Sequence, residues 1–434
     1  MFSNVKRLRK NILSGVSSQS FKILTQIFYP PLMIMFWGIE NFGIWIFLIS
    51  LPNIIQIFNL NLTDASINQM AIYNARKEFN KSNEIFQNTI IFTLLNILFF
   101  SVLIFLFFKF NSTEFSVLKK LDTQNLKVIL GLIFASIYLK FFESIFNTNL
   151  YSLGKINIGY NLETFYDLFS KIFIIIAGIF YNSLIVAALI IFILSMLKFI
   201  IKFFLFLKYK KKLKFSLDLL STRVIIRLIR LSIGHMSDIG SNIIKSSGVI
   251  FILGIFLNPY MLGYISTVKT LFYFMPVNFF GKVSFAINFE LSNLFGVRRF
   301  NQIKDMLKKY FKIILFLIVL YIAVSFILGP FIYQYWINNK YEINKLFLLL
   351  ILLDTSFYIL RNTIISPFVA INKNSNLGIS DLLFSILAIL LFFLSFEIGK
   401  DYIFAFGIIT IFSLLSLIYS AFYLTFNLKK IKLK

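Results

Sequence analysis

Nine basic residues lie inside stretches of sequence that are otherwise apolar, and their side chains are the ones best placed to do chemistry. They are Lys22, Lys140, Lys171, Lys198, Lys202, Lys245, Lys269, Lys282 and Arg361. If these stretches cross a membrane, each lysine or arginine at the bilayer centre costs about 2.5–3.5 kcal/mol on insertion scales. The nine side chains must therefore reach the membrane surface, pair with acids or line a wet cavity.

Some of these basic residues have a local explanation. Lys198 and Lys202 lie near one end of their segment, and we expect their side chains to extend to the membrane surface. Two other lysines have an acid about one helical turn away, on the same helix face: Lys140 with Glu143, and Lys171 with Asp167. For both of these lysines, a pair within the helix and the lining of a cavity remain open.

The remaining candidates lie deeper within their segments. Lys22, Lys245 and Arg361 are near the middle of theirs, and Lys269 is ten residues into its own. We predict that these four, with Lys140, line a cationic central cavity that holds an anionic group such as a phosphate through charge-assisted hydrogen bonds. The alternative is that they form structural ion pairs between helices.

Five acidic residues are candidates for ion coupling. They are Asp64, Asp167, Asp238, Asp354 and Asp381. An intramembrane carboxylate either carries a proton or sodium ion or balances a neighbouring cation, and we favour balance. Asp238 precedes Lys245 by seven residues and Asp354 precedes Arg361 by seven, so each pair shares a helix face.

The composition places the chain in a membrane. Of its 434 residues, 59% are hydrophobic and 14% are charged, and the mean hydropathy is +0.84. A soluble domain is about 45–50% apolar and about 25% charged, so a soluble enzyme is excluded. There is no cysteine and one histidine, His235, which excludes disulfides, thiolate metal sites and histidine clusters. We expect no cofactor and no metal.

The apolar runs predict about twelve transmembrane helices, because about 20 apolar residues cross a bilayer and the runs do not alternate as barrel strands would. The predicted segments are 12–36, 39–60, 85–108, 127–151, 162–180, 184–207, 229–257, 260–289, 311–337, 345–371, 376–396 and 402–426. The predicted class is therefore an all-α polytopic membrane protein.

Lysine and arginine are distributed unequally between the two sides. With the N-terminus in the cytoplasm, inside segments hold 27 of these residues and outside loops hold seven. Positive residues favour the cytoplasmic side, so we predict that both termini are cytoplasmic. Most of the net charge of +25 then reflects topology and attraction to anionic lipids, and we expect no nucleic-acid partner.

The two halves of the chain resemble each other. We predict an N-terminal lobe (1–207), a basic cytoplasmic linker (208–228) and a C-terminal lobe (229–434), each lobe with six helices. FWGIENFGIW, with a turn ending at Gly43, matches FLNPYMLGYI with Gly263, and Asp167 matches Asp381. An even number of spans in each half predicts lobes related by pseudo-two-fold symmetry about the membrane normal.

The chain resembles the polysaccharide-exporter branch (Wzx-type O-antigen and capsule flippases) of the multidrug/oligosaccharidyl-lipid/polysaccharide (MOP) transporter superfamily. The resemblance rests on the length, the twelve spans, E-x-F-G-I-W at 40–45, and the basic R-K-E-F-N and R-R-F-N-Q loops after the second and eighth spans. It implies a two-lobed, MATE-like fold that opens alternately to each side. It also implies an undecaprenyl-diphosphate-linked oligosaccharide as substrate, a bacterial inner-membrane location, and a polysaccharide polymerase and chain-length regulator as partners.

We therefore predict a flippase rather than an enzyme, since the sequence has no nucleotide-binding loop and no large catalytic loop. One alternative is a cation-coupled multidrug exporter of the same superfamily, in whose site acids should dominate. Another is an integral-membrane polysaccharide polymerase or ligase. A lipid II flippase is a nearer rival, although such flippases typically have fourteen spans.

Overall fold

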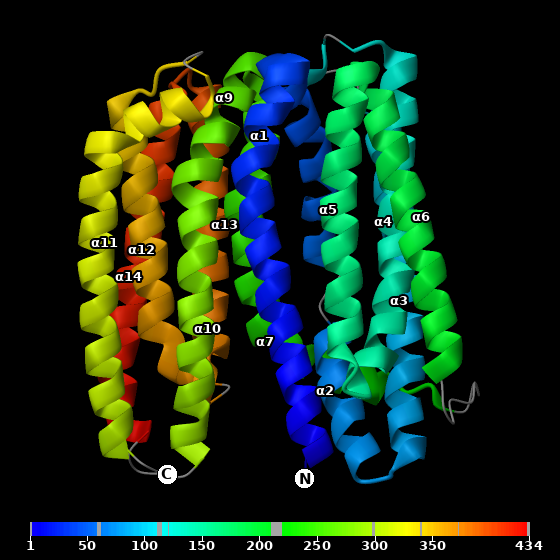
Figure 1. Cartoon of the computed structure of the whole chain (residues 1–434). Coiled ribbons are helices and arrows are strands. Elements are labelled where there is room, and N and C mark those ends of the chain that lie inside the picture. The colour runs from blue at the N-terminus through cyan, green and yellow to red at the C-terminus, as the bar shows by residue number, and fades with distance from the viewer. Residues whose placement is uncertain are drawn as a thin grey trace. The chain divides into compact units, whose positions relative to one another are not determined.

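The computed structural model describes residues 2–58, 62–110, 115–119, 121–209, 219–296, 300–338, 341–371 and 373–431. In these ranges the chain consists of helices joined by short turns, without strands. The helices are α1 (Phe2–Phe58), α2 (Leu62–Ala75), α3 (Phe79–Phe110), α4 (Thr123–Ser152), α5 (Ile156–Phe180), α6 (Leu184–Tyr209), α7 (Thr222–Ile243), α8 (Val249–Phe256), α9 (Pro259–Lys269), α10 (Met275–Gly296), α11 (Phe300–Trp336), α12 (Lys345–Ala370), α13 (Ser375–Glu397) and α14 (Tyr402–Ile431) (Figure 1). The predicted all-α class is confirmed.

The chain divides into two compact units. Unit 1 comprises Met1–Ile233 and Leu257–Leu262, and unit 2 comprises Gly234–Phe256 and Gly263–Lys434. The boundary passes through α7, after Ile233. The predicted linker, 208–228, lies ahead of this boundary. Its residues 210–218 are outside the described ranges, and its last residues already belong to α7. The pseudo-two-fold relation between the halves stays a prediction.

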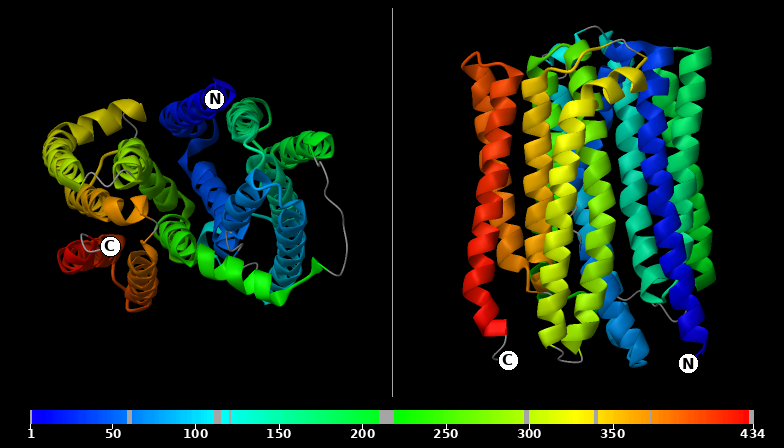
Figure 2. Two further views of the ribbon diagram at one scale, coloured as in Figure 1. Left: turned by 90° about the horizontal axis from the view of Figure 1, so that it is seen from below. Right: turned by 60° about the vertical axis from the view of Figure 1, so that its left-hand side comes forward.

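In unit 1, α1 lies beside α5 and α4 lies beside α6 (Figures 1 and 2). The first two predicted spans form one helix with a kink at Gly38, whose φ of 77° is a value that glycine adopts without steric cost. The predicted turn at Gly43 is wrong, because residue 43 is helical and a single glycine is enough to redirect the chain. The neighbouring Trp37 indole packs directly on Gly178 of α5, leaving no room for a side chain there.

The second predicted span, 39–60, ends close to the end of α1 at Phe58, but the sequence analysis predicted no helix directly after it. A further helix, α2, extends to Ala75 despite its polar sequence. The Ser66 and Thr89 hydroxyls, 2.7 Å apart, join α2 to α3, so the polar groups are satisfied between helices. The turn that follows holds Glu78, whose pKa is lowered chiefly by its hydrogen bond with the Lys81 ammonium.

In unit 2, α12 packs against α10, α11 and α14, and α14 also packs against α13 (Figure 2). Two π-helical turns interrupt its helices: Ile244–Gly248 lies between α7 and α8, and Thr270–Phe274 between α9 and α10. Pro276 has no N–H to donate to the Phe272 carbonyl four residues back. The Thr355 hydroxyl donates to that carbonyl instead, at 3.0 Å, which ties the second π turn to α12.

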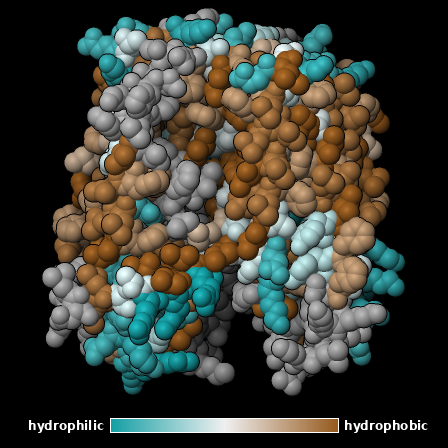
Figure 3. Space-filling view, turned by 180° about the vertical axis from the view of Figure 1, so that it is seen from behind, coloured by the Kyte–Doolittle hydropathy of each residue, from teal (hydrophilic) through white to brown (hydrophobic). Residues whose placement is uncertain are grey.

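Nine helical segments in the described part of the chain are long and apolar enough to cross a membrane. Twelve were predicted. Three differences explain the smaller number: α1 joins two of them, α5 contains the charged residues Glu163, Asp167 and Lys171, and the eighth is divided into α9 and α10 by a π turn. Apolar side chains cover the middle of the helices on the face in Figure 3, and hydrophilic ones gather at their ends. The chain is a multi-pass membrane protein.

Candidate functional site

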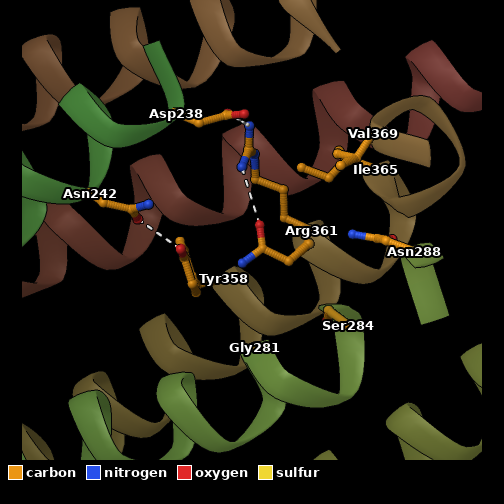
Figure 4. Close-up of a pocket in the computed structure, with 10 residues that line it drawn as sticks. Asp238, Asn242, Gly281, Ser284, Asn288, Tyr358, Arg361, Ile365 and Val369 are labelled. Carbon is orange, nitrogen blue, oxygen red and sulfur yellow. Dashed lines mark hydrogen bonds and ion pairs between the residues drawn. The ribbon is translucent and has the colours of Figure 1, made fainter. Parts of the chain in front are cut away.

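A polar pocket lies within unit 2, between α7, α10 and α12. Its volume is about 270 Å³. Carboxylate, amide, hydroxyl and guanidinium groups line it, together with two aliphatic side chains: Asp238, Asn242, Gly281, Ser284, Asn288, Tyr358, Arg361, Asn362, Ile365 and Val369 (Figure 4). Ligand pockets are typically about 300–1,000 Å³, so this pocket has room for one charged group or sugar ring rather than a whole oligosaccharide.

Helical spacing groups the polar lining residues into three helix faces, and each face forms one wall of the pocket. Tyr358, Arg361 and Asn362 lie three or four residues apart on α12, and spacings of three or four put side chains on one helix face. The same spacing joins Asp238 to Asn242 on α7, and Ser284 to Asn288 on α10. The Tyr358 hydroxyl donates to the Asn242 side-chain oxygen at 2.7 Å, which links α12 to α7 at the edge of the pocket.

Arg361 is the one basic side chain among the described residues that line the pocket, and it is 3% exposed. Its Nη2 donates to the Leu377 carbonyl at 3.0 Å, while Nη1 is 3.5 Å from the Asn362 side-chain oxygen. The nearest carboxylate oxygens are farther than a good hydrogen bond allows: Asp238 is 3.7 Å from Nη2, and Asp381 is 3.4 Å from Nε. A guanidinium has five N–H donors, so Arg361 retains hydrogen-bonding capacity toward the pocket.

Asp381, which is not among the described pocket-lining residues, accepts a second set of hydrogen bonds near Arg361. Its Oδ1 accepts from the Lys245 ammonium at 3.0 Å and from the Ser416 hydroxyl at 2.6 Å, and its Oδ2 accepts from Ser241. The first π turn contains Lys245, which is one helical turn beyond Ser241. The sequence predicted that Lys245 shares a helix face with Asp238; in the structure its ammonium pairs with Asp381 of α13. Asp381 therefore balances the charge of Lys245.

Two further candidate residues of unit 2 lie close to this cluster. The Lys269 ammonium donates to the Lys245 carbonyl at 3.1 Å and has the rings of Tyr273, Phe274 and Phe406 at 5.5–5.7 Å. Asp354 accepts from the Ser413 hydroxyl at 2.6 Å rather than from Arg361, its predicted neighbour on the same helix face. Neither residue lines the pocket.

Unit 1 contains a separate buried ion-pair cluster. Lys198 and Lys202 on α6 both contact Glu143 Oε2 of α4, each at 3.1 Å. Both also contact Glu163 of α5, Lys198 at 3.1 Å. The prediction that these lysines reach the membrane surface is wrong, because they are 5% and 0% exposed and their two charges are balanced by two carboxylates. Glu143 is thereby engaged with α6 instead of Lys140.

Replacing Lys202 by methionine is expected to destabilise unit 1. The substitution keeps most of the apolar stem but leaves Glu143 and Glu163 with a single cation, and breaking a buried pair costs about 3–5 kcal/mol. We expect a lower melting temperature and less monodisperse protein in detergent. Lys208→Met, at an exposed position on the same helix, is the control. Equal melting temperatures for the two variants would contradict a structural role for the cluster.

The other candidates in unit 1 are dispersed. Lys171 donates to the Thr25 hydroxyl of α1 at 2.6 Å. Lys140 and Asp167 are half-buried on α4 and α5, and no hydrogen bond or ion pair of either side chain is seen among the described residues. The side chains of Lys22 and Asp64, and that of His235 in unit 2, lie outside what the structure describes.

The structure thus brings Asp238, Lys245, Arg361 and Asp381 together, with equal numbers of positive and negative charges. Among the pocket-lining residues whose side chains the structure describes, one is positively charged, Arg361, and one is negatively charged, Asp238. Sequence reasoning missed the polar groups around them, namely Asn242, Ser284, Asn288 and Tyr358. Their spacing of three or four residues from other polar side chains, in helices otherwise rich in apolar residues, was the available signal.

Comparison with known proteins gives a consistent answer for the fold. No protein-family model matches the sequence, and no curated protein matches it. Among solved structures, the lipid II flippase MurJ in an inward closed conformation aligns with a TM-score of 0.67 and 18% identity over 97% of this chain and 90% of its own. A mutant of the Vibrio cholerae MATE transporter VcmN aligns with a TM-score of 0.64 and 11% identity over 100% of both chains.

A MOP-superfamily transporter from Pyrococcus furiosus aligns with a TM-score of 0.57 and 13% identity over 99% of this chain and 96% of its own. The chain therefore has the fold of MurJ and the MATE transporters, and the MATE-like architecture predicted from the sequence is confirmed. These structural neighbours are transporters and flippases of the MOP superfamily.

Proposed function

We propose that the protein is a flippase that moves a polyprenyl-diphosphate-linked oligosaccharide across the bacterial inner membrane. The observation that carries this proposal is Arg361, a buried guanidinium with available donors, set among amide and hydroxyl groups in the pocket. Arginine binds phosphate oxygens through charge-assisted hydrogen bonds, and amides and hydroxyls hydrogen-bond sugars. The polyprenyl chain would stay in the bilayer.

Alternating access is the mechanism that we propose for this flippase. A site exposed in turn to each side of the membrane would let the diphosphate and the first sugars cross without entering hydrocarbon. We propose that both termini are cytoplasmic and that an ion gradient or the membrane potential drives the cycle. Lys22, Lys140 and Lys269 remain proposed contributors of positive charge along the substrate path, and Asp64, Asp167 and Asp354 remain proposed coupling residues.

A multidrug exporter is the second candidate, and Asp238 is the observation in its favour. Its side chain is 24% exposed, and it lines the pocket as an acid that an organic cation would require. We rank this candidate lower because Arg361 lies in the same wall and repels cations. The two candidates predict different ligands for one pocket, so a single experiment separates them.

Deletion of the gene in its host tests the proposal. We expect loss of surface polysaccharide and accumulation of the diphosphate-linked glycan on the cytoplasmic side, both restored by a plasmid copy. Surface glycan and the sidedness of the lipid-linked precursor would be measured. Intact glycan with increased sensitivity to cationic dyes would overturn the flippase and favour drug export.

A further inference from the structure

We propose that Lys269 is a positioning residue for the anion site at Arg361. Its ammonium holds the first π turn, Ile244–Gly248, in the shape that places the Lys245 side chain on Asp381. The inference rests on the proposed function, and it adds a residue that acts on the site without contacting the substrate. This role differs from a direct contribution of positive charge to the substrate path.

Lys269 is a buried cation that has a carbonyl rather than an acid as its partner. The residue is 2% exposed, and in the part of the chain that the structure describes no carboxylate forms an ion pair with it. Its ammonium donates to the Lys245 carbonyl at 3.1 Å. The rings of Tyr273, Phe274 and Phe406 lie 5.5–5.7 Å from it. A charge is costly to bury without compensation, so the carbonyl and the rings together hold the ammonium in place.

The Lys245 carbonyl needs this donor because it lies in a π turn. In an α-helix each carbonyl accepts from the N–H four residues further on, which for Lys245 is the N–H of Val249. In the structure that N–H donates to the carbonyls of Ile244 and Ser246 instead. A buried carbonyl without a donor is unfavourable, and Lys269 supplies the hydrogen bond from the end of α9. The ammonium therefore stabilises the π turn relative to a regular helix.

The backbone of Lys269 is itself fixed by the second π turn, Thr270–Phe274, which begins at the next residue. The Phe272 carbonyl in that turn accepts from the hydroxyl of Thr355, at 3.0 Å. Thr355 belongs to α12, the helix that also carries Arg361. The hydrogen bond from Lys269 thus joins the two π turns of unit 2, and one of them is tied to the helix of the anion site.

The first π turn sets the position of the Lys245 side chain. Its ammonium donates to Asp381 Oδ1 at 3.0 Å, and the same oxygen lies 3.4 Å from Nε of Arg361. Two cations thus share one carboxylate oxygen. While Lys245 holds Asp381, the carboxylate neutralises the guanidinium only in part, and Arg361 keeps its attraction for an anion in the pocket.

Removal of the Lys269 ammonium is therefore expected to weaken the anion site from a distance. Without this donor, the Lys245 carbonyl is best satisfied by a regular α-helical turn, and each residue by which the helix shifts rotates its side chains by about 100°. The Lys245 side chain then leaves Asp381, whose charge acts on Arg361 alone. An anion that enters the pocket must compete with that carboxylate, so its affinity falls.

The experiment measures binding of geranyl diphosphate to the full-length protein in phosphatidylcholine nanodiscs. We expect Lys269→Met to bind this probe about tenfold more weakly than wild type. Lys308→Met removes an equal charge from an exposed position on α11 and should bind as wild type does. Melting temperatures in the same nanodiscs establish that each variant is folded.

The same substitution in a Lys245→Met/Asp381→Asn background shows how Lys269 acts. That background lacks the ion pair that Lys269 positions, but it retains Arg361 without the opposing carboxylate, so binding of the probe remains measurable. We expect Lys269→Met to have no further effect there, because residues that act through one another are not additive. An equal loss in both backgrounds would mean that the ammonium attracts the anion directly, and the inference would be overturned.

A folded Lys269→Met variant that binds as tightly as wild type would overturn the inference as well. If Lys269→Met does not fold, Lys269→Gln takes its place in both backgrounds. Its amide keeps an N–H donor, so the expected loss is smaller, but this loss must again disappear in the Lys245→Met/Asp381→Asn background. If instead wild type and Arg361→Gln bind the probe equally, the proposed function itself has failed.

Discussion

Arg361→Ala is expected to reduce transport of the lipid-linked oligosaccharide by about a hundredfold or more. Removal of one partner from a buried, charge-assisted contact costs about 2–5 kcal/mol, and each 1.4 kcal/mol is a factor of ten. In the gene-deletion strain, the variant should leave surface polysaccharide close to the level of the empty vector. Precursor should accumulate on the cytoplasmic side.

Two variants control this prediction. Arg361→Lys keeps the charge but loses the planar fork that contacts two phosphate oxygens, so we expect an intermediate defect. Arg227→Ala removes an exposed arginine from α7 and should behave as wild type. Membrane levels of all variants would be compared by immunoblot. Normal surface glycan with Arg361→Ala at wild-type abundance would exclude the guanidinium as the anion site.

Asp381→Ala is expected to have the largest effect on stability. The substitution removes the acceptor of Lys245, Ser241 and Ser416 together. It leaves two buried cations, Lys245 and Arg361, without this counter-ion, and Arg361 keeps Asp238 at 3.7 Å. The cost of an uncompensated buried charge is about 3–5 kcal/mol, a large part of the stability of a typical domain. We expect little monodisperse protein after detergent extraction, measured by fluorescence size-exclusion chromatography.

The double variant Lys245→Met/Asp381→Asn tests whether charge balance is the cause. It removes one positive and one negative charge, so Arg361 and Asp238 remain as a balanced pair. We expect it to be more stable than either single variant, a coupling that neighbouring residues in one network show. Simple additivity of the two single effects would mean that Lys245 and Asp381 act independently, contrary to their 3.0 Å contact.

The helices were largely predictable from the sequence, because membrane-spanning helices consist of long runs of apolar residues. The exceptions have local causes. The helix α2 is polar and was assigned to a loop, although Ser66 finds its partner on α3. The kink in α1 lies between the predicted spans 12–36 and 39–60, as expected. The residue that forms it is Gly38, whereas the sequence analysis had ended the turn at Gly43.

The site was predictable only in part. Heptad spacing predicted that Asp238 and Lys245 share a helix face, yet Lys245 lies in the π turn after α7 and pairs with Asp381, 136 residues away in the sequence. Arg361 likewise meets Asp238 and Asp381 rather than Asp354 of its own helix. Sequence spacing identifies side chains that can pair within one helix. Pairs between helices depend on which helices pack together, and sequence spacing does not give that information. The Lys198–Lys202 cluster was missed for the same reason.

Translocation by the purified protein tests whether it is a flippase. Full-length protein would be reconstituted into vesicles with a fluorescent polyprenyl-diphosphate oligosaccharide in both leaflets, and a membrane-impermeant quencher would report the accessible fraction. We expect the accessible fraction of the lipid to rise from about half to nearly all with wild type, and to stay at about half with Arg361→Ala. Folded wild-type protein that leaves the lipid in place, while driving accumulation of a cationic dye, would contradict it.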